Sequence, residues 1–247
     1  MNDRFPDPAL RFAGAVSAAA EVDLGRELSL GTTVVGSPRR EGSTLAVAYP
    51  LGDRTVIWCA PTLAPRLSTL NRPDAVTGDE FLAAAESLGA SFVGRGHLRV
   101  LTGEPASLSR HGYDVIELDR DEPADRGLLA AFTAGCSEDD LDEAELDLHE
   151  LDPAIVVLVD ETGSIASYAS GRPWALDADF DDIAVLTHPD HRGRRLGAAV
   201  VAEFARRRQR SGRLLLYNHN VENHGSERVA QTVGFEVMNT VVAVGFD

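Results

Sequence analysis

Hydrophobic residues in the first half of the chain follow two different periods. The runs STLAVAY and TVIWCAP flank the turn-forming sequence PLGDR, a pattern typical of a β-hairpin. Apolar residues at helical spacing predict a helix in GDEFLAAAESLGA (78–90), with its glycine as the C-terminal cap. SFVGRGHLRVL (91–101) predicts another strand, whereas the alanine-rich first forty residues predict only a short helix around 14–24.

From Tyr113 onward, strands and helices alternate. Strands are expected at 113–118, 154–160, 164–171, 181–188, 213–219 and 236–246, the last as one strand or a pair. Helices are expected at 121–135, 137–152, 198–209 and 223–234. This order predicts a mixed α/β arrangement with one central sheet. The turn-rich connector at 104–112 divides the chain into a smaller N-terminal α/β domain of unknown role (1–110) and a second domain (111–247).

Charge narrows the range of partners. The 247-residue chain has a formal net charge of −16, and all 23 basic residues are arginine. Such a charge argues against nucleic acid or anionic lipid as a main partner and favours an amine-bearing substrate, although solubility alone is an alternative explanation. No apolar run approaches the roughly 20 residues of a membrane span, and the first ten residues do not resemble a signal peptide. We therefore expect a cytoplasmic protein, and the residue usage suggests a GC-rich bacterial source.

The two cysteines do not indicate a metal or disulfide site. Cys59 and Cys136 are far apart and lack C-x-x-C spacing. We expect both to be buried small apolar residues in a reducing compartment, and we expect no metal.

The segment HPDHRGRRLG (188–197) concentrates arginine and glycine between a predicted strand and a predicted helix. A helix N-terminus offers unpaired N–H groups to anions, glycine permits close backbone approach, and arginine adds charged hydrogen bonds. The sequence therefore indicates a phosphate or pyrophosphate site, with a solvated arginine-rich helix start as the alternative. The other common phosphate-binding patterns, G-x-x-x-x-G-K-[ST] and G-x-G-x-x-G after a strand, are absent.

VLTHPDHRGRRLGAAV resembles the coenzyme A pyrophosphate loop of the GNAT superfamily of N-acetyltransferases. The family pattern is Arg/Gln-x-x-Gly-x-Gly/Ala, and Arg192 and Gly197 match its first and last positions. The residues 187–189 match the approach to the loop. The middle glycine of the pattern is Arg195 here.

A second segment, NHGSERVAQTVGF (223–235), resembles the family's N-x-x-A/S-x-x-L-x-x-x-x-G-F element. The matching positions are Asn223, Ser226, Val229, Gly234 and Phe235. The serine suggests the branch that includes ribosomal-protein N-terminal acetyltransferases and many actinobacterial proteins. The resemblance covers about 113–247. It does not extend to residues 1–110, for which a reduced relative of the second half is one alternative.

The resemblance implies a GNAT-like mixed central sheet that holds acetyl-CoA where two parallel strands, 182–187 and 213–217, splay apart. It assigns backbone contacts with the pantetheine arm to Val185, Leu186 and Thr187. Pyrophosphate and other cofactor contacts fall to Arg192, Gly193, Arg194, Arg195, Leu196, Gly197, Ala198, Asn223 and Ser226. The acceptor amine then attacks the thioester directly, so no enzyme nucleophile is required.

A carboxylate or a water chain must take the proton of the attacking ammonium. Asp181 and Asp182, at the start of the first splayed strand, are the candidates, with a solvated strand entrance as the alternative. Counting back from the loop favours Asp181. Glu222 and His219 are weaker candidates, and His188 and His191 are expected beside coenzyme A or on the loop surface.

The acid for the leaving thiolate is less clear, because the family's usual tyrosine position is Ala230 here. Ser226 would donate a hydrogen bond to the thiolate, or the thiolate would leave unassisted. Tyr217, on the neighbouring strand, is a remote substitute.

The acceptor side is expected to be formed by the acidic helix 137–152 and the segment GRPWALDADFDD (171–182). Trp174 would form a cation pocket with four aspartates, or would pack on the sheet edge; the aspartates are Asp177, Asp179, Asp181 and Asp182. We expect an acetyl-CoA-dependent N-acetyltransferase, monomeric or homodimeric, that acts on a primary amine of a small molecule or peptide. The alternatives are a non-catalytic acyl-CoA-binding or regulatory module, and an interaction protein whose N-terminal half binds a partner.

Overall fold

The computed structural model describes residues 8–20, 31–119, 121–144, 154–174 and 179–247. The chain forms two compact units. The first holds Met1–Arg99, His219–Asn223 and Val237–Asp247, and the second holds Val100–Asn218 and His224–Glu236. The domain division at 110/111 stays a prediction, since it was made on sequence composition and these units are defined by contacts.

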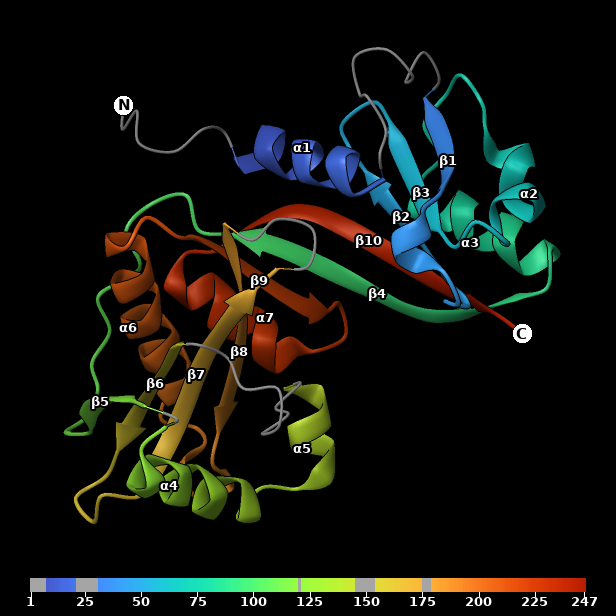
Figure 1. The fold of residues 1–247 in the computed structure, drawn as a ribbon. Helices are drawn as coiled ribbons and strands as arrows, with labels where there is room; N and C mark the ends of the chain where they lie inside the picture. The colour runs from blue at the N-terminus through green and yellow to red at the C-terminus, as the bar shows by residue number, and fades with distance from the viewer. Residues whose placement is uncertain (1–7, 21–30, 120, 145–153, 175–178) are drawn as a thin grey trace. The chain divides into compact units, whose positions relative to one another are not determined.

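The first unit is a sheet with strand order β1-β3-β2-β10-β4 (Figure 1). Its strands are β1 (Thr32–Gly36), β2 (Leu45–Pro50), β3 (Thr55–Cys59), β4 (Ala90–Val100) and β10 (Glu236–Phe246). Its helices are α1 (Pro8–Ala20), α2 (Ala64–Leu67) and α3 (Gly78–Ser87), with single 3₁₀ turns η1 (Pro38–Arg40) and η2 (Ser68–Leu70). β1 is parallel to β3, whereas β2 is antiparallel to β3 and β10.

The core of the first unit lies between the sheet and α3. Phe81 and Ala85 of α3 are fully buried against Ile57 and Val242 of the sheet. On α1, Phe12 is buried and its ring lies 6.1 Å from that of Tyr49. Burying such apolar side chains is the main favourable contribution to folding.

The second unit has strand order β9-β8-β7-β6-β5, with β8 and β9 parallel and the other neighbours antiparallel (Figure 1). Its strands are β5 (Asp114–Leu118), β6 (Ala154–Val159), β7 (Ile165–Pro173), β8 (Phe180–Thr187) and β9 (Leu214–Asn220). Its helices are α4 (Pro123–Ala134), α5 (Glu138–Glu143), α6 (Leu196–Arg210) and α7 (His224–Val233), with a 3₁₀ turn η3 (Pro189–His191) before α6.

Two cores lie on the two faces of the sheet in the second unit. One packs α6 and α7 on the sheet, with Phe204, Tyr217 and Phe235 among its buried rings. The other packs α4 and α5 on the opposite face, around Phe132 and Tyr168. The residues of β6 are buried throughout, because each face of this strand meets one of the two cores. This explains why AIVVLV is a continuous apolar run.

The mixed α/β class predicted from the sequence is confirmed. The hairpin, the helix at α3 and the alternating elements from β5 to β10 are present where the sequence predicts them, and the last is one long strand. Gly89 follows α3 with φ 83, in the left-handed region that a glycine cap requires. The first helix starts at Pro8 rather than Gly14, and β1 was not predicted. Of the acidic helix 137–152, the described part is α5, and 145–152 lies outside the described residues.

Candidate active site

The parallel strands β8 and β9 pair over three residues and then separate. Residues 180–182 face residues 214–216, whereas β8 continues to Thr187 and β9 to Asn220. On its other edge, β8 stays paired with β7 as far as Thr187. In the described register, residues 183–187 therefore lack a strand partner on the β9 side. The predicted splayed strands are confirmed.

A pocket open to solvent lies where the two strands separate. Its described lining holds three charged side chains together with polar and apolar residues: Glu143, Ala144, Arg172, Asp182, Ile183, Ala184, Val185, Tyr217, Asn218 and Ser226. Glu143 belongs to the α4–α5 side of the sheet and Ser226 to the α6–α7 side. The pocket thus reaches both helical layers through the gap.

Three backbone features shape the loop between β8 and α6. Gly193 and Arg195 both have positive φ values, 78° and 60°. Arg195 is the N-cap of α6, and its side chain makes no capping hydrogen bond. A methyl group built on Gly193 would meet no other atom within 4 Å. Alternation of handedness along a loop turns successive N–H groups toward one concave side, and uncapped N–H groups at a helix start attract anions. The loop therefore presents a ready backbone site for phosphate groups.

Arg192 joins the loop to α5. Its guanidinium lies 2.7 Å from Asp140 and also donates to the carbonyl oxygen of Thr187 at 3.2 Å. A hydrogen bond from the Ser137 hydroxyl, followed by the contact with Arg192, holds the pKa of Asp140 below its usual range. Arg192 is consequently engaged with the protein, which differs from a side chain directed only at a ligand.

The other two arginines of the loop behave differently from each other. Arg194 donates to the Tyr113 hydroxyl at 2.6 Å. The exposed Arg195 side chain makes no hydrogen bond or ion pair with any other residue that the structure describes. Of the three cations, Arg195 is thus the one whose charge no described carboxylate or hydroxyl engages.

The two neighbouring aspartates of β8 have opposite surroundings. Asp181 is fully buried and accepts hydrogen bonds from Arg208 at 2.5 Å and from Arg213 at 2.6 Å. Asp182 is half-buried and lines the pocket. Because successive residues of a strand point to opposite faces, only one of the two can reach the gap. A catalytic role for either residue stays a prediction, and this placement supports Asp182 alone.

The α7 side of the pocket contains Ser226 and Tyr217. Tyr217 is 1 % exposed, and its ring lies 5.4 Å from that of Phe235. Ala230 is fully buried in the same core. Val185 lines the pocket, whereas Leu186 points into the opposite core, and the Thr187 hydroxyl lies 2.9 Å from that of Ser167.

The remaining candidates of the β9–α7 segment lie in the first unit. His219 is buried and receives a hydrogen bond from the Arg99 Nε at 3.0 Å. Glu222 is exposed, and the Asn223 N–H donates to the carbonyl oxygen of Asn220. Their expected roles in catalysis or cofactor binding stay predictions.

On the acceptor side, Trp174 lies edge-on to Phe180 at the start of β8, with ring centroids 5.8 Å apart, and both its expected roles stay predictions. Asp177 lies outside the described residues. Asp179 is exposed.

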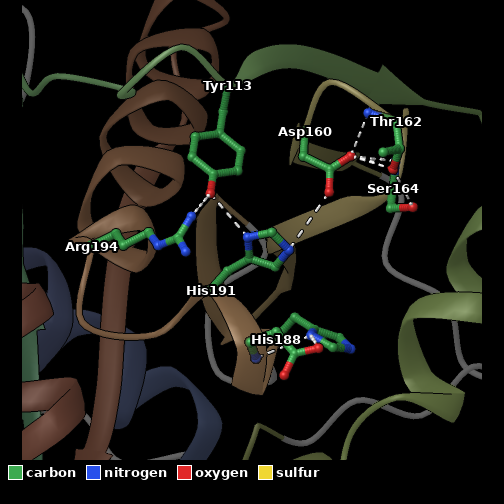
Figure 2. A network of polar contacts seen from close by, with 8 residues as sticks. Tyr113, Asp160, Thr162, Ser164, His188, His191 and Arg194 are labelled. Carbon is green, nitrogen blue, oxygen red and sulfur yellow. Dashed lines mark hydrogen bonds and ion pairs between the residues drawn. The ribbon is translucent and has the colours of Figure 1, made fainter.

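A polar network that the sequence did not predict surrounds the loop (Figure 2). Tyr113 stands between Arg194 and His191, and His191 stands between Tyr113 and Asp160. Tyr113 precedes His191 by 78 positions, so no local pattern signals this contact. His188 also lies beside His191, with ring centroids 5.9 Å apart, so both histidines are part of the loop's own packing.

Cys59 is buried and Cys136 half-buried, and burial raises the pKa of the Cys59 thiol to about 11. Among the described residues, no group of three His, Cys, Asp or Glu side chains is arranged to hold a metal ion. No helix in the described ranges is long and apolar enough to cross a membrane.

Comparisons with known proteins agree with this geometry. The sequence profile of the acetyltransferase (GNAT) family matches residues 115–235. A search of curated proteins found no match to the chain. The family match does not identify a branch, so the actinobacterial, serine-containing branch stays a prediction.

Two solved structures share the fold. A GCN5-related N-acetyltransferase from Sphaerobacter thermophilus is 17 % identical, covers 100 % of this chain and 98 % of its own, and has a TM-score of 0.52. An acetyltransferase of the GNAT family from Colwellia psychrerythraea is 13 % identical, covers 77 % of this chain and 76 % of its own, and has a TM-score of 0.51. Residues 115–235 therefore match the acetyltransferase (GNAT) family in sequence, and the two solved structures share the fold of the chain.

Proposed function

We propose that the protein is an acetyl-CoA-dependent N-acetyltransferase that acts on a primary amine of a small molecule or peptide. The observation that carries this proposal is the position of the strand gap. The gap between β8 and β9 opens directly beside a loop whose helix end is uncapped and whose backbone is left-handed at Gly193 and Arg195. A thioester on a phosphate-bearing arm is the kind of ligand that needs both features at once.

The residues present fit coenzyme A. Backbone N–H groups from Gly193 to Ala198 would bind the pyrophosphate, and Arg195 would add a cation next to it. The unpaired edge of β8 from Val185 to Thr187 would bind the amide groups of the pantetheine arm, as a short additional strand. When bound, acetyl-CoA supplies an activated acyl group.

We infer that Asp182 is the general base. It lines the pocket beside Glu143 and opposite Arg172 in the strand register. Carboxylates in the pocket would attract an ammonium group, and one of them would accept its proton before attack. Asp181 is not proposed, because two arginines bind its carboxylate in the core.

Ser226 and Tyr217 are the hydroxyl-bearing residues of the described lining and would stabilise the departing sulfur. They line the α6–α7 side of the gap, opposite the carboxylates. This separation supports proton uptake on one side of the sheet and thiol release on the other. The cytoplasmic location and the monomeric or homodimeric state remain predictions.

The test is release of free thiol from acetyl-CoA in the presence of a panel of amines, together with calorimetric titration of coenzyme A. We expect micromolar binding and turnover with at least one amine. Asp182→Asn is expected to lower kcat by about 100-fold or more, the usual contribution of a positioned base. Asp114→Asn, which removes the same charge from an exposed position on β5, is the matched control.

Coenzyme A binding without turnover on any amine would favour the non-catalytic acyl-CoA-binding module. Absence of binding would favour an interaction protein. Equal kcat for Asp182→Asn and Asp114→Asn would remove Asp182 from the mechanism.

A further inference from the structure

The contact of Arg194 with Tyr113 has a defined direction. A guanidinium only donates hydrogen bonds, so the phenol oxygen of Tyr113 accepts from the Arg194 Nη1 at 2.6 Å. The Tyr113 ring packs against the core of the second unit that contains α6. The partner of Arg194 is thus held by the fold rather than by a mobile surface side chain.

The next contact determines how the phenol is oriented. The Tyr113 hydroxyl lies 2.9 Å from the Nδ1 of His191, and the two rings meet edge to face, with centroids 5.6 Å apart. The phenol either donates its proton to this nitrogen or accepts a proton from it, depending on the histidine tautomer. The surroundings of the other ring nitrogen decide between these arrangements.

Asp160 lies on that other side. One of its carboxylate oxygens is 3.7 Å from the Nε2 of His191 (Figure 2). Its second oxygen accepts from the Thr162 hydroxyl at 2.6 Å and from the N–H groups of Thr162 and Ser164. These hydrogen bonds, the Thr162 hydroxyl foremost, hold the pKa of Asp160 below its usual range. An ionised carboxylate near Nε2 favours the tautomer with its proton there, so Nδ1 accepts from the phenol.

The N–H and O–H donors of this polar network then all point the same way. Arg194 donates to Tyr113, Tyr113 donates to His191, and the Nε2 proton of His191 faces Asp160. We propose that Tyr113, oriented by His191, positions Arg194 and thereby holds the 192–198 loop in its phosphate-binding conformation. This rests on the proposed coenzyme A site. Tyr113 and His191 are positioning residues in this account, since they act through the loop and not on the reacting atoms.

The loop needs such support because α6 has no side-chain cap and Arg195 is left-handed. Leaving the N–H groups open for a ligand removes the usual means of fixing a helix start. The network instead fixes the loop from outside, through the residue before β5 and the turn between β6 and β7. Backbone N–H groups would thereby bind the phosphate, while the side chains of the network hold the loop in place.

The test is calorimetric titration of the full chain with coenzyme A, accompanied by KM and kcat for acetyl-CoA. Tyr113→Phe keeps the ring and removes the hydroxyl, and it is expected to raise the Kd about tenfold, the value of one charged hydrogen bond. The KM should rise with it while kcat at saturation stays within about twofold, because the proposed positioning affects binding and not the reacting groups. Arg194→Ala should raise the Kd at least as much as Tyr113→Phe, whereas Arg210→Ala, which removes the same charge at the exposed far end of α6, should leave the Kd unchanged.

A histidine pair distinguishes positioning from general packing. His191→Asn keeps an amide oxygen near the place of Nδ1 and should stay within about threefold of the wild type, whereas His191→Ala should match Tyr113→Phe. An unchanged Kd in both Tyr113→Phe and His191→Ala would overturn the inference and leave the proposed function intact. The same conclusion would follow if His191→Asn bound coenzyme A as weakly as His191→Ala. Failure of the wild-type protein to bind coenzyme A would overturn both.

Discussion

The N-terminal ends of α3 and α6 differ in whether a side chain of the N-cap residue satisfies the first backbone N–H groups of the helix. Both helices begin near a glycine packed against strand side chains: a methyl group on Gly78 would lie 2.7 Å from Val242, and one on Gly197 would lie 3.2 Å from Thr187. In α3, Thr77 and Glu80 form a complete capping box. In α6, the side chain of the N-cap residue Arg195 makes no capping hydrogen bond. The closed end belongs to a structural helix, whereas the open end lies where an anion would bind.

The two helices are also anchored at different ends. The capping box fixes α3 where it starts. In α6 the ion pair of Arg208 with the buried Asp181 lies in the last turn, and Arg213 joins it from the following strand entrance. A cation in the last turn also interacts favourably with the helix dipole. A helix held at its far end can leave its first turn to a ligand.

The largest expected effect is the loss of stability when the ion pair between Asp181 and the last turn of α6 is removed. Asp181→Asn leaves two arginines around a buried neutral group and should lower the free energy of unfolding by about 3 kcal/mol. Asp182→Asn, one residue away on the half-buried pocket wall, should lower it by much less, because Asp182 is not enclosed by two arginines in the core. Urea denaturation of both variants measures the contrast. A stable Asp181→Asn variant with lost turnover would instead make Asp181 the base.

Gly197→Val tests whether the open end requires close contact with β8. The added methyl groups would meet Thr187 and Val229, and overpacking of this kind costs about 1–3 kcal/mol. We also expect weaker coenzyme A binding, because α6 must shift away from β8. Gly127→Val in α4, where a methyl group meets nothing within 4 Å, is the matched control. Equal thermal midpoints for the two variants would mean that the α6 start tolerates displacement.

Thr77→Ala removes the side-chain cap of α3. It should lower the free energy of unfolding by about 1 kcal/mol without any effect on coenzyme A binding. Hydrogen bonds from the Thr77 N–H and hydroxyl, together with Arg72, lower the pKa of Glu80. A carboxyl group whose pKa is lowered by folding stabilises the protein above its unfolded pKa of about 4.3, and this contribution is lost as the pH falls through the folded pKa. Part of the cost of Thr77→Ala should therefore disappear between pH 7 and pH 3 in denaturant titrations. A cost that grows with acid would contradict the capping role.

The smallest effect is expected at Arg195. Glycine accepts the left-handed backbone that costs an arginine about 1–2 kcal/mol, but it also gains entropy in the unfolded chain. Arg195→Gly should therefore stabilise the protein by at most about 1 kcal/mol. We expect its coenzyme A affinity to stay within about fivefold, the range of an exposed charge pair. A much greater loss of affinity would identify the arginine side chain, rather than the loop backbone, as the principal ligand.

The parts of this architecture that local patterns encode could be predicted. Hydrophobic period and glycine caps located α3 and the elements from β5 to β10, and the spacing of glycine and arginine located the loop. β1 was missed because TTVVG is short and follows a segment without periodicity. The different surroundings of Asp181 and Asp182 could not be predicted from the sequence, because they depend on strand facing and on arginines 27 and 32 positions away. The support of the loop by Tyr113 was equally beyond reach, since it arises only when distant segments meet.

The place of β10 in the sheet has a consequence for the order in which the chain folds during synthesis. β10 lies between β2 and β4, and residues 242–245 pair with residues 45–48. The sheet of the first unit thus lacks an interior strand until residues 236–246 leave the ribosome. The second unit ends at Glu236 and has all of its strands before then. The first unit therefore begins before the second and is completed after it, and its unpaired strand edges must stay out of intermolecular contacts until residues 236–246 have been synthesised.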